Sequence, residues 1–101
     1  MLPDNLPTLA FLAKSLGDEN RLRILLALQN GQKSVSAIVE ELQLSQPLVS
    51  HHLKELRRAL LVEVERRGPF VYYQMAHPGI LGLLKAMEAL AGALLAARKT
   101  F

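Results

Sequence analysis

Residues 44–56 read LSQPLVSHHLKEL, and this stretch decides how the rest of the sequence is interpreted. Ser45 can cap a helix, and Pro47 is tolerated in the first turn because no intrahelical N–H bond is required there. Successive helical residues lie about 100° apart around the axis, so apolar and polar residues sort onto opposite faces. The stretch therefore predicts an amphipathic helix that runs from Ser45 to about Leu60.

The two faces of this predicted helix differ in character. An apolar arc is expected to face the core, with His52 as a packed imidazole that has one nitrogen satisfied. That arc holds Leu48, Val49, His52, Leu53, Leu56, Ala59 and Leu60. The opposite arc combines cations with polar hydrogen-bonding side chains and has an acid, Glu55, only at its margin. Its members are Gln46, Pro47, Ser50, His51, Lys54, Arg57 and Arg58. A solvated surface would also give such a stripe, so the context has to decide.

The context is a short helix immediately before this one. Ser34 or Ser36 can cap a helix that runs to Leu42, and residues 43–45 form a tight turn. Two helices joined in this way, about residues 34–60, form a helix-turn-helix motif. The second helix fits the major groove of B-DNA, where short polar side chains reach base edges and Lys or Arg contact phosphates. The polar stripe is thus predicted to bind double-stranded DNA.

A hairpin is predicted directly after the helix. Residues 62–66 alternate between apolar and charged side chains, Gly68-Pro69 is a turn, and residues 70–75 are β-branched and aromatic. Arg66 and Arg67 precede the turn, where cations can reach the DNA backbone or minor groove. A two-stranded wing, about residues 62–76, after a basic recognition helix is the winged-helix arrangement.

Composition limits the other possibilities. The chain has 101 residues and a net charge of +3, and its length favours a single domain over residues 1–101. It has no cysteine, which excludes thiolate chemistry. The N-terminal residues lack the pattern of a secretion signal, so we expect a cytoplasmic protein. Residues 79–97 are strongly apolar, but Lys85 and Glu88 would each cost roughly 2.5–3.5 kcal/mol at a bilayer centre. We expect that segment to be covered by protein and not by a membrane.

The most economical cover is a second copy of the chain, because half of its residues are apolar. Two helices, about residues 6–16 and 80–98, are predicted to form a homodimer interface, although burial within one subunit is the alternative. A stripe of small side chains on the last helix allows close helix approach, with leucines beside it. The predicted interface comprises Leu9, Phe11, Leu12, Gly82, Leu83, Ala86, Ala89, Leu90 and Ala93.

The segment LSQPLVSHHLKELRRALLVEVERRGPFVYY resembles the ArsR/SmtB family of bacterial winged-helix repressors, and DENRLRILLAL resembles that family's second helix. The resemblance covers almost the whole chain. It implies a homodimeric repressor that binds operator DNA and is commonly released by a metal ion or another signal. The element pattern itself predicts a mostly α fold with about five helices and a small β-hairpin, and a two-fold dimer would read an inverted repeat. The resemblance also implies that Gln46, Ser50 and His51 lie at the major groove and that the wing arginines are contacts at the wing tip. Together with the helix analysis, the predicted DNA-binding residues are Ser45, Gln46, Pro47, Ser50, His51, Lys54, Arg57, Arg58, Arg66 and Arg67.

The sequence also departs from the family. Ser34-Val35-Ser36 stands where many members have a Cys-Val-Cys metal site, and the last helix has no histidine. We therefore predict no metal and no cofactor, and the effector stays open. Leu60 and Gln43 occupy positions where the family often has glycine, which predicts left-handed backbone there.

Three functional hypotheses remain. The first is a repressor of the ArsR type without the familiar metal sites. The second is a repressor controlled by a small organic molecule or a protein partner, and the third is an interaction module that has lost DNA binding. An enzyme is not expected, because the three histidines form no recognisable acid–base pair.

Overall fold

The computed structural model describes residues 3–98. The elements are a 3₁₀ turn η1 (Pro3–Asn5), α1 (Leu6–Leu16), α2 (Glu19–Ala27), β1 (Lys33–Ser34), α3 (Val35–Leu42), α4 (Gln46–Arg58), β2 (Val62–Arg67), β3 (Phe70–Met75) and α5 (Gly79–Ala97). The predicted helices and hairpin are confirmed. The prediction of two strands was incomplete, because β1 pairs with β3 and gives an antiparallel sheet of order β1-β3-β2.

Side-chain caps set the starts of the central helices. The Ser34 and Ser45 hydroxyl oxygens accept hydrogen bonds from the N–H groups of Ala37 (3.1 Å) and Leu48 (3.3 Å), as the sequence predicted. Asp18 caps α2 in the same way. This helix ends at Ala27, and residues 28–30 form a turn.

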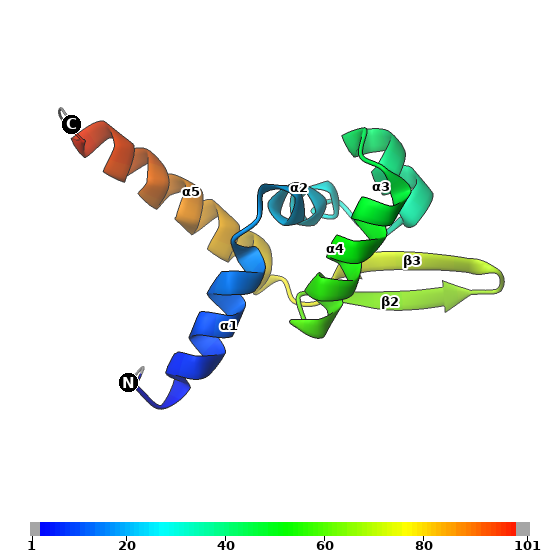
Figure 1. The fold of residues 1–101 in the computed structure, drawn as a ribbon, viewed down its shortest axis with the longest axis horizontal. Coiled ribbons are helices and arrows are strands. Elements are labelled where there is room, and N and C mark those ends of the chain that lie inside the picture. The colour runs from blue at the N-terminus through cyan, green and yellow to red at the C-terminus, as the bar shows by residue number, and fades with distance from the viewer. Residues whose placement is uncertain (1–2, 99–101) are drawn as a thin grey trace.

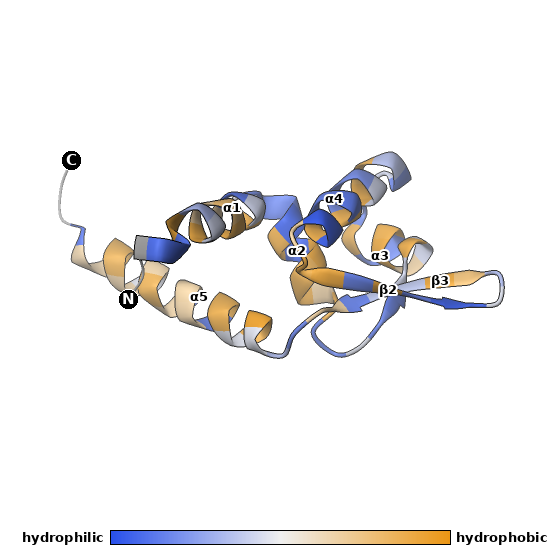
Figure 2. Cartoon of the chain, turned by 90° about the horizontal axis from the view of Figure 1, so that it is seen from below, coloured by the Kyte–Doolittle hydropathy of each residue, from blue (hydrophilic) through white to orange (hydrophobic). Residues whose placement is uncertain are grey.

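The body of the molecule consists of α2, α3, α4 and the sheet, whereas α1 and α5 extend away from it at one end (Figure 1). The radius of gyration is 15.4 Å, compared with about 13 Å for a compact chain of this length. The excess reflects the two extended helices. Figure 2 shows that hydrophobic residues continue along α5 well beyond the body, while the outer side of α4 is hydrophilic.

The core lies under the inner face of α4. Val49, His52, Leu53 and Leu56 are buried there, and they meet buried residues of α2, α3, the sheet and the start of α5. The predicted orientation of this face is confirmed with one exception. Leu60 was placed on the apolar arc, but it is 80% exposed.

The exception follows from how α4 ends. Leu60 has φ 63°, so the chain leaves the helix in the left-handed conformation that the resemblance to the family implied. The N–H of Leu61 bonds to the carbonyl of Leu56 (2.9 Å), and the N–H of Leu60 bonds to that of Arg57 (3.0 Å). This pair of bonds is a Schellman motif, which turns Leu61 into the core and Leu60 out to solvent.

A leucine in this left-handed position is strained, so we predict that Leu60→Gly raises the free energy of unfolding by about 1 kcal/mol. Gln43 has φ 56°, but its side-chain amide donates to the carbonyl of Glu40 (2.7 Å). Gln43→Gly loses that bond and should stabilise less. Urea unfolding at one protein concentration measures both variants, and a destabilised Leu60→Gly would contradict the assignment of strain.

Candidate nucleic-acid interface

The outer face of α4 presents the predicted recognition residues to solvent. Ser45, Gln46, Pro47, His51, Lys54, Arg57 and Arg58 are exposed, and Ser50 is half-buried. The Gln46 amide donates to the Ser50 hydroxyl (3.2 Å), which aligns two polar side chains one turn apart near the start of the helix. The polar groups therefore lie in the N-terminal half of α4 and the cations in the C-terminal half.

The cations of α4 are not equivalent. Within residues 3–98, the side chains of Lys54 and Arg57 make no hydrogen bond or ion pair. Arg58, by contrast, donates to both carboxylate oxygens of Glu55 (3.2 and 3.1 Å), so its charge is partly balanced. Lys54 and Arg57 are thus the cations of this helix that are available to an anionic partner.

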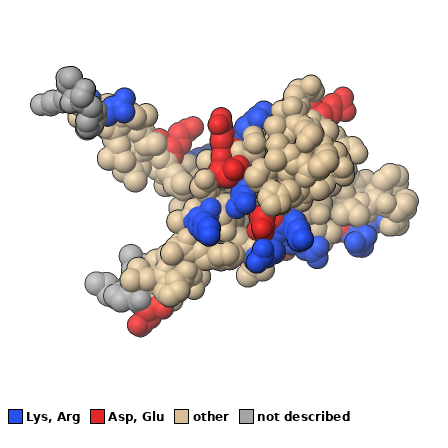
Figure 3. Space-filling model, viewed as in Figure 1, with Lys and Arg blue, Asp and Glu red and all other residues tan. Residues whose placement is uncertain are grey.

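The wing shows the same division. Arg67 donates to Glu65 (3.1 Å) and its guanidinium lies 5.1 Å from the centre of the Tyr72 ring, and the bond from Arg67 lowers the pKa of Glu65. Arg66 has no such partner in the described part of the chain. Gly68, with φ 59°, supplies the left-handed residue of the turn. Figure 3 shows Lys and Arg side chains gathered along one side of the body and continuing toward the wing.

His52, which is buried, connects α4 to α2. Its Nδ1 accepts a hydrogen bond from the Arg21 Nε (3.2 Å), and its Nε2 lies 3.7 Å from the Asp18 carboxylate. Because Nδ1 is an acceptor, the proton of the neutral ring is on Nε2 and points toward Asp18. The packed imidazole predicted from the sequence is confirmed. Its partners were missed, since they lie 31 or more positions away along the chain.

The predicted dimer residues lie on the two extended helices. Leu9, Phe11, Leu83 and Leu90 are exposed, as are Gly82, Ala86, Ala89 and Ala93. Leu12 differs, because it packs partly against the core of its own subunit. By length and composition α5 could cross a membrane, and only 11% of its apolar 18-residue stretch is buried within the chain. Its apolar surface therefore requires a covering that one copy does not provide.

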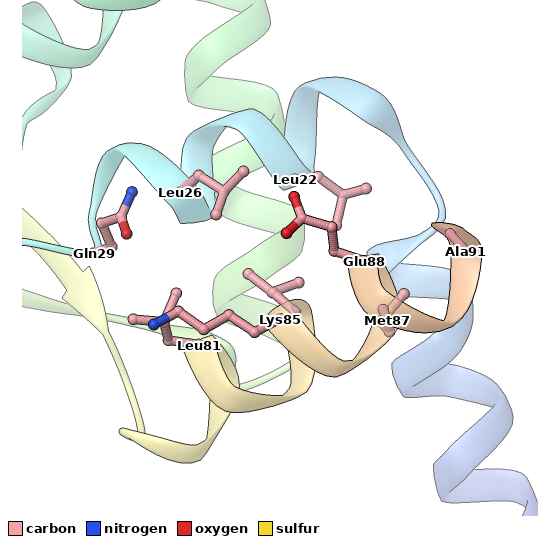
Figure 4. Close-up of a pocket in the computed structure, with 9 residues that line it drawn as sticks. Leu22, Leu26, Gln29, Leu81, Lys85, Met87, Glu88 and Ala91 are labelled. Atoms are coloured by element: carbon pink, nitrogen blue, oxygen red, sulfur yellow. The ribbon is translucent and has the colours of Figure 1, made fainter. Parts of the chain in front are cut away.

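A groove of about 510 Å³ separates α2 from α5 (Figure 4). Leu22, Leu26, Leu84 and Met87 make its walls mostly apolar, and Lys85 and Glu88 add charged groups from α5. The remaining lining residues are Gln29, Leu81 and Ala91.

Residues 3–98 contain no group of three or more His, Cys, Asp or Glu side chains placed to hold a metal ion. His77, which precedes α5, uses its Nδ1 to accept a hydrogen bond from the N–H of Gly79 (2.8 Å). Its role in this structure is to shape the turn before α5.

Comparison with known proteins identifies the family of this chain. The profile described as "Bacterial regulatory protein, arsR family" matches residues 18–64, from the cap of α2 into β2. MJ1325 of Methanocaldococcus jannaschii, an HTH-type transcriptional regulator, is 35% identical over 76% of this chain and 88% of its own length. The chain belongs to the arsR family. The transcriptional repressor SdpR of Bacillus subtilis is 36% identical over 61% of this chain and 69% of its own length.

A solved structure extends the similarity of this arsR-family chain to both extended helices. The homodimeric winged helix-turn-helix DNA-binding domain of Mb0332 from Mycobacterium bovis, a possible ArsR-family regulator, matches with a TM-score of 0.81. It is 28% identical, and the match covers 95% of this chain and 89% of that one. The fold is thus a winged helix-turn-helix, and the family is one of transcriptional regulators and not of enzymes.

We predict that His52 makes stability depend on pH. Burial lowers the pKa of His52 below its ordinary value of 6.5, with the Asp18 charge opposing that shift. As the pH falls through 6.5 the unfolded chain takes up a proton before the folded chain does, so stability declines. Urea unfolding between about pH 7.5 and pH 5.5 should show this decline in the wild type.

His52→Gln keeps a side-chain acceptor for Arg21 but does not titrate, so the decline should be smaller in this variant. His51→Gln, at the exposed neighbour, should retain it. An unchanged pH dependence in His52→Gln would show that this ring does not couple folding to pH.

Proposed function

We propose that this chain is a homodimeric repressor of transcription that binds an inverted-repeat operator through α4 of each subunit. The observation that carries the proposal is the outward cationic and polar face of α4, opposite a face buried in the core. Family membership supports DNA binding, and the names of relatives such as SdpR support repression. We also infer a single winged domain over residues 1–101 that acts in the cytoplasm, where its DNA is accessible.

Roles on the helix follow from position. Gln46, Ser50 and His51 lie in the part of α4 that can enter the major groove, where Gln pairs with adenine and Ser or His bonds several bases. Lys54 and Arg57 lie further along and contact phosphates, which positions the helix without reading sequence. Arg66 at the wing adds a contact to the neighbouring backbone. The residues that complete the surface are Ser45, Pro47, Arg58 and Arg67.

A second copy provides the cover that α5 requires. Leu83 and Leu90, together with the small-residue stripe of α5 and the exposed residues of α1, form one apolar surface for a partner. A bilayer would have to accommodate Lys85 and Glu88 in its centre, which is costly. A two-fold dimer presents two recognition helices to half-sites about one helical turn, or roughly 10 base pairs, apart.

Control by a small organic molecule is the form of regulation that the geometry favours over metal control. The groove between α2 and α5 falls within the volume range of small-molecule sites, roughly 300–1,000 Å³. A molecule bound there would change the angle between α5 and the DNA-binding body, and hence the spacing of the two recognition helices.

The direct test is a promoter with the selected operator placed before a reporter gene. Co-expression of the chain should lower reporter output, and deletion of the operator should abolish this effect. Increased output would make the protein an activator. If selection from random duplexes returns no operator, that result would support the alternative that the chain is an interaction module without DNA binding.

Base reading can be tested on α4. Ser50→Ala and His51→Ala should each reduce the preference for operator over random DNA by roughly 1–3 kcal/mol, because a base contact is lost. Lys54→Ala is the comparator, since a phosphate contact weakens binding to all sequences similarly. Titrations of both duplexes measure the ratio of affinities. If Ser50→Ala and His51→Ala keep the wild-type ratio, α4 does not read the operator as proposed.

The dimer can be tested on α5. Leu90→Glu places a carboxylate in the proposed apolar interface, so this variant should sediment as a monomer and bind the operator weakly. Leu60→Glu is the matched control, because Leu60 is also an exposed leucine (80%, against 59% for Leu90) but lies at the end of α4, outside the proposed interface. Sedimentation equilibrium measures both. A Leu90→Glu protein that dimerises like the wild type would remove α5 from the interface.

A further inference from the structure

A small basic hollow lies where α1, α2 and the C-terminal half of α4 meet. Its volume is about 210 Å³. Three cations and one acid take part in its lining. The lining residues are Phe11, Lys14, Ser15, Arg21, Glu55 and Arg58.

Most polar groups of the hollow already have partners. Arg58 is bound to Glu55, and the Arg21 guanidinium donates to His52 and to the Ser15 carbonyl (3.5 Å). The Ser15 hydroxyl donates to the Phe11 carbonyl (2.9 Å). These contacts fix the shape of the hollow. Its lining still has more positive than negative charges, with three cations and one acid.

Lys14 is the exception. It is exposed in the last turn of α1, and its side-chain ammonium makes no hydrogen bond or ion pair with any residue from 3 to 98. Lys54, Arg57 and Arg66, the other cations without such partners on this side, are the proposed phosphate contacts of α4 and the wing. Lys14 therefore shares with them the property that suits a cation to bind an external anion.

The hollow also continues the DNA-binding surface. Arg58 belongs both to the outer face of α4 and to the lining of the hollow, so no neutral strip separates the two. Figure 3 shows the Lys and Arg side chains extending from the wing past α4 toward the junction with α1. This end of α4 is nearer to α1 and α5, which is the side of the proposed two-fold axis (Figure 1).

We propose that the hollow binds a backbone phosphate of the operator, with the Lys14 ammonium as the contact and Arg21 and Arg58 adding to its positive field. The proposal rests on the proposed function, since it requires α4 to lie on DNA. The phosphate belongs to the central part of the inverted repeat, between the two half-sites. Each subunit then contacts the duplex at the wing, along α4 and at the end of α1.

Lys14→Ala is the test variant, because alanine suits an exposed helical position and should not disturb folding. Lys14→Arg is the matched control, because it keeps a positive charge at the same exposed position of α1. Affinities for the operator and for random duplex are measured over a series of KCl concentrations, together with dimerisation by sedimentation.

Lys14→Ala should weaken binding to both duplexes by a similar factor. It should also reduce the slope of log affinity against log salt by about 1 per lost contact. Because a dimer carries two hollows and both contact the duplex, a total reduction of about 2 is expected. Lys14→Arg, which keeps the charge, should match the wild type in slope.

The failures can be told apart. If wild-type protein shows no salt-dependent DNA binding, the proposed function fails and this inference with it. If Arg66→Ala reduces the slope but Lys14→Ala does not, the proposed function stands and the inference is overturned. Inorganic phosphate is the remaining probe: if calorimetry shows that Lys14→Ala abolishes its binding while DNA binding is unchanged, the hollow serves a free anion and the inference is again overturned.

Discussion

Rotation of α4 about its own axis is the one degree of freedom on which the proposed DNA-binding surface depends, and core packing removes it. Leu53 and Leu56 are completely buried beneath the helix. Each such side chain contributes roughly 1.5–3 kcal/mol through burial. A rotation by one residue would expose these leucines and drive Lys54 toward the core, where an unpaired charge is strongly unfavourable. The direction in which the recognition side chains point is therefore determined by the opposite face of the same helix.

His52 adds a directional constraint that leucines alone do not provide. Apolar contacts tolerate small sliding motions, whereas the bond from Arg21 to the imidazole requires a particular height and angle of α4 relative to α2. Asp18 serves two purposes, because the same carboxylate caps α2 and faces the imidazole. Asp18, Arg21 and His52 together thus fix the start of α2 against the middle of α4. The geometric specificity of these hydrogen bonds is a physical reason for a polar group to lie in the core at this position.

What could be predicted from the sequence was local. The faces of α4 and the serine caps depend on residues within a few positions of one another, and the structure confirms them. The left-handed Leu60 was expected only from the resemblance to the family, which often has glycine there. The exposure of Leu60 was not predicted, because a helical wheel assumes that the helix continues. The strand at Lys33 was too short to show alternation, and its pairing with Tyr73 is non-local. The Arg21–His52 bond and the hollow around Lys14 need three helices to come together, which no periodicity reports.

The extended helices impose a different requirement from the body. The body has its own core, whereas most of α5 lies beyond it and exposes leucines along its length. A surface of this kind is stable in water only when something covers it, and a two-fold partner covers both α5 helices at once. Coverage by a partner also places α1 near the axis and so brings the end of α1 close to the centre of any DNA that both recognition helices contact. The end of α1 is also where Lys14 lies, whose side chain has no partner within residues 3–98 and is proposed to contact a phosphate.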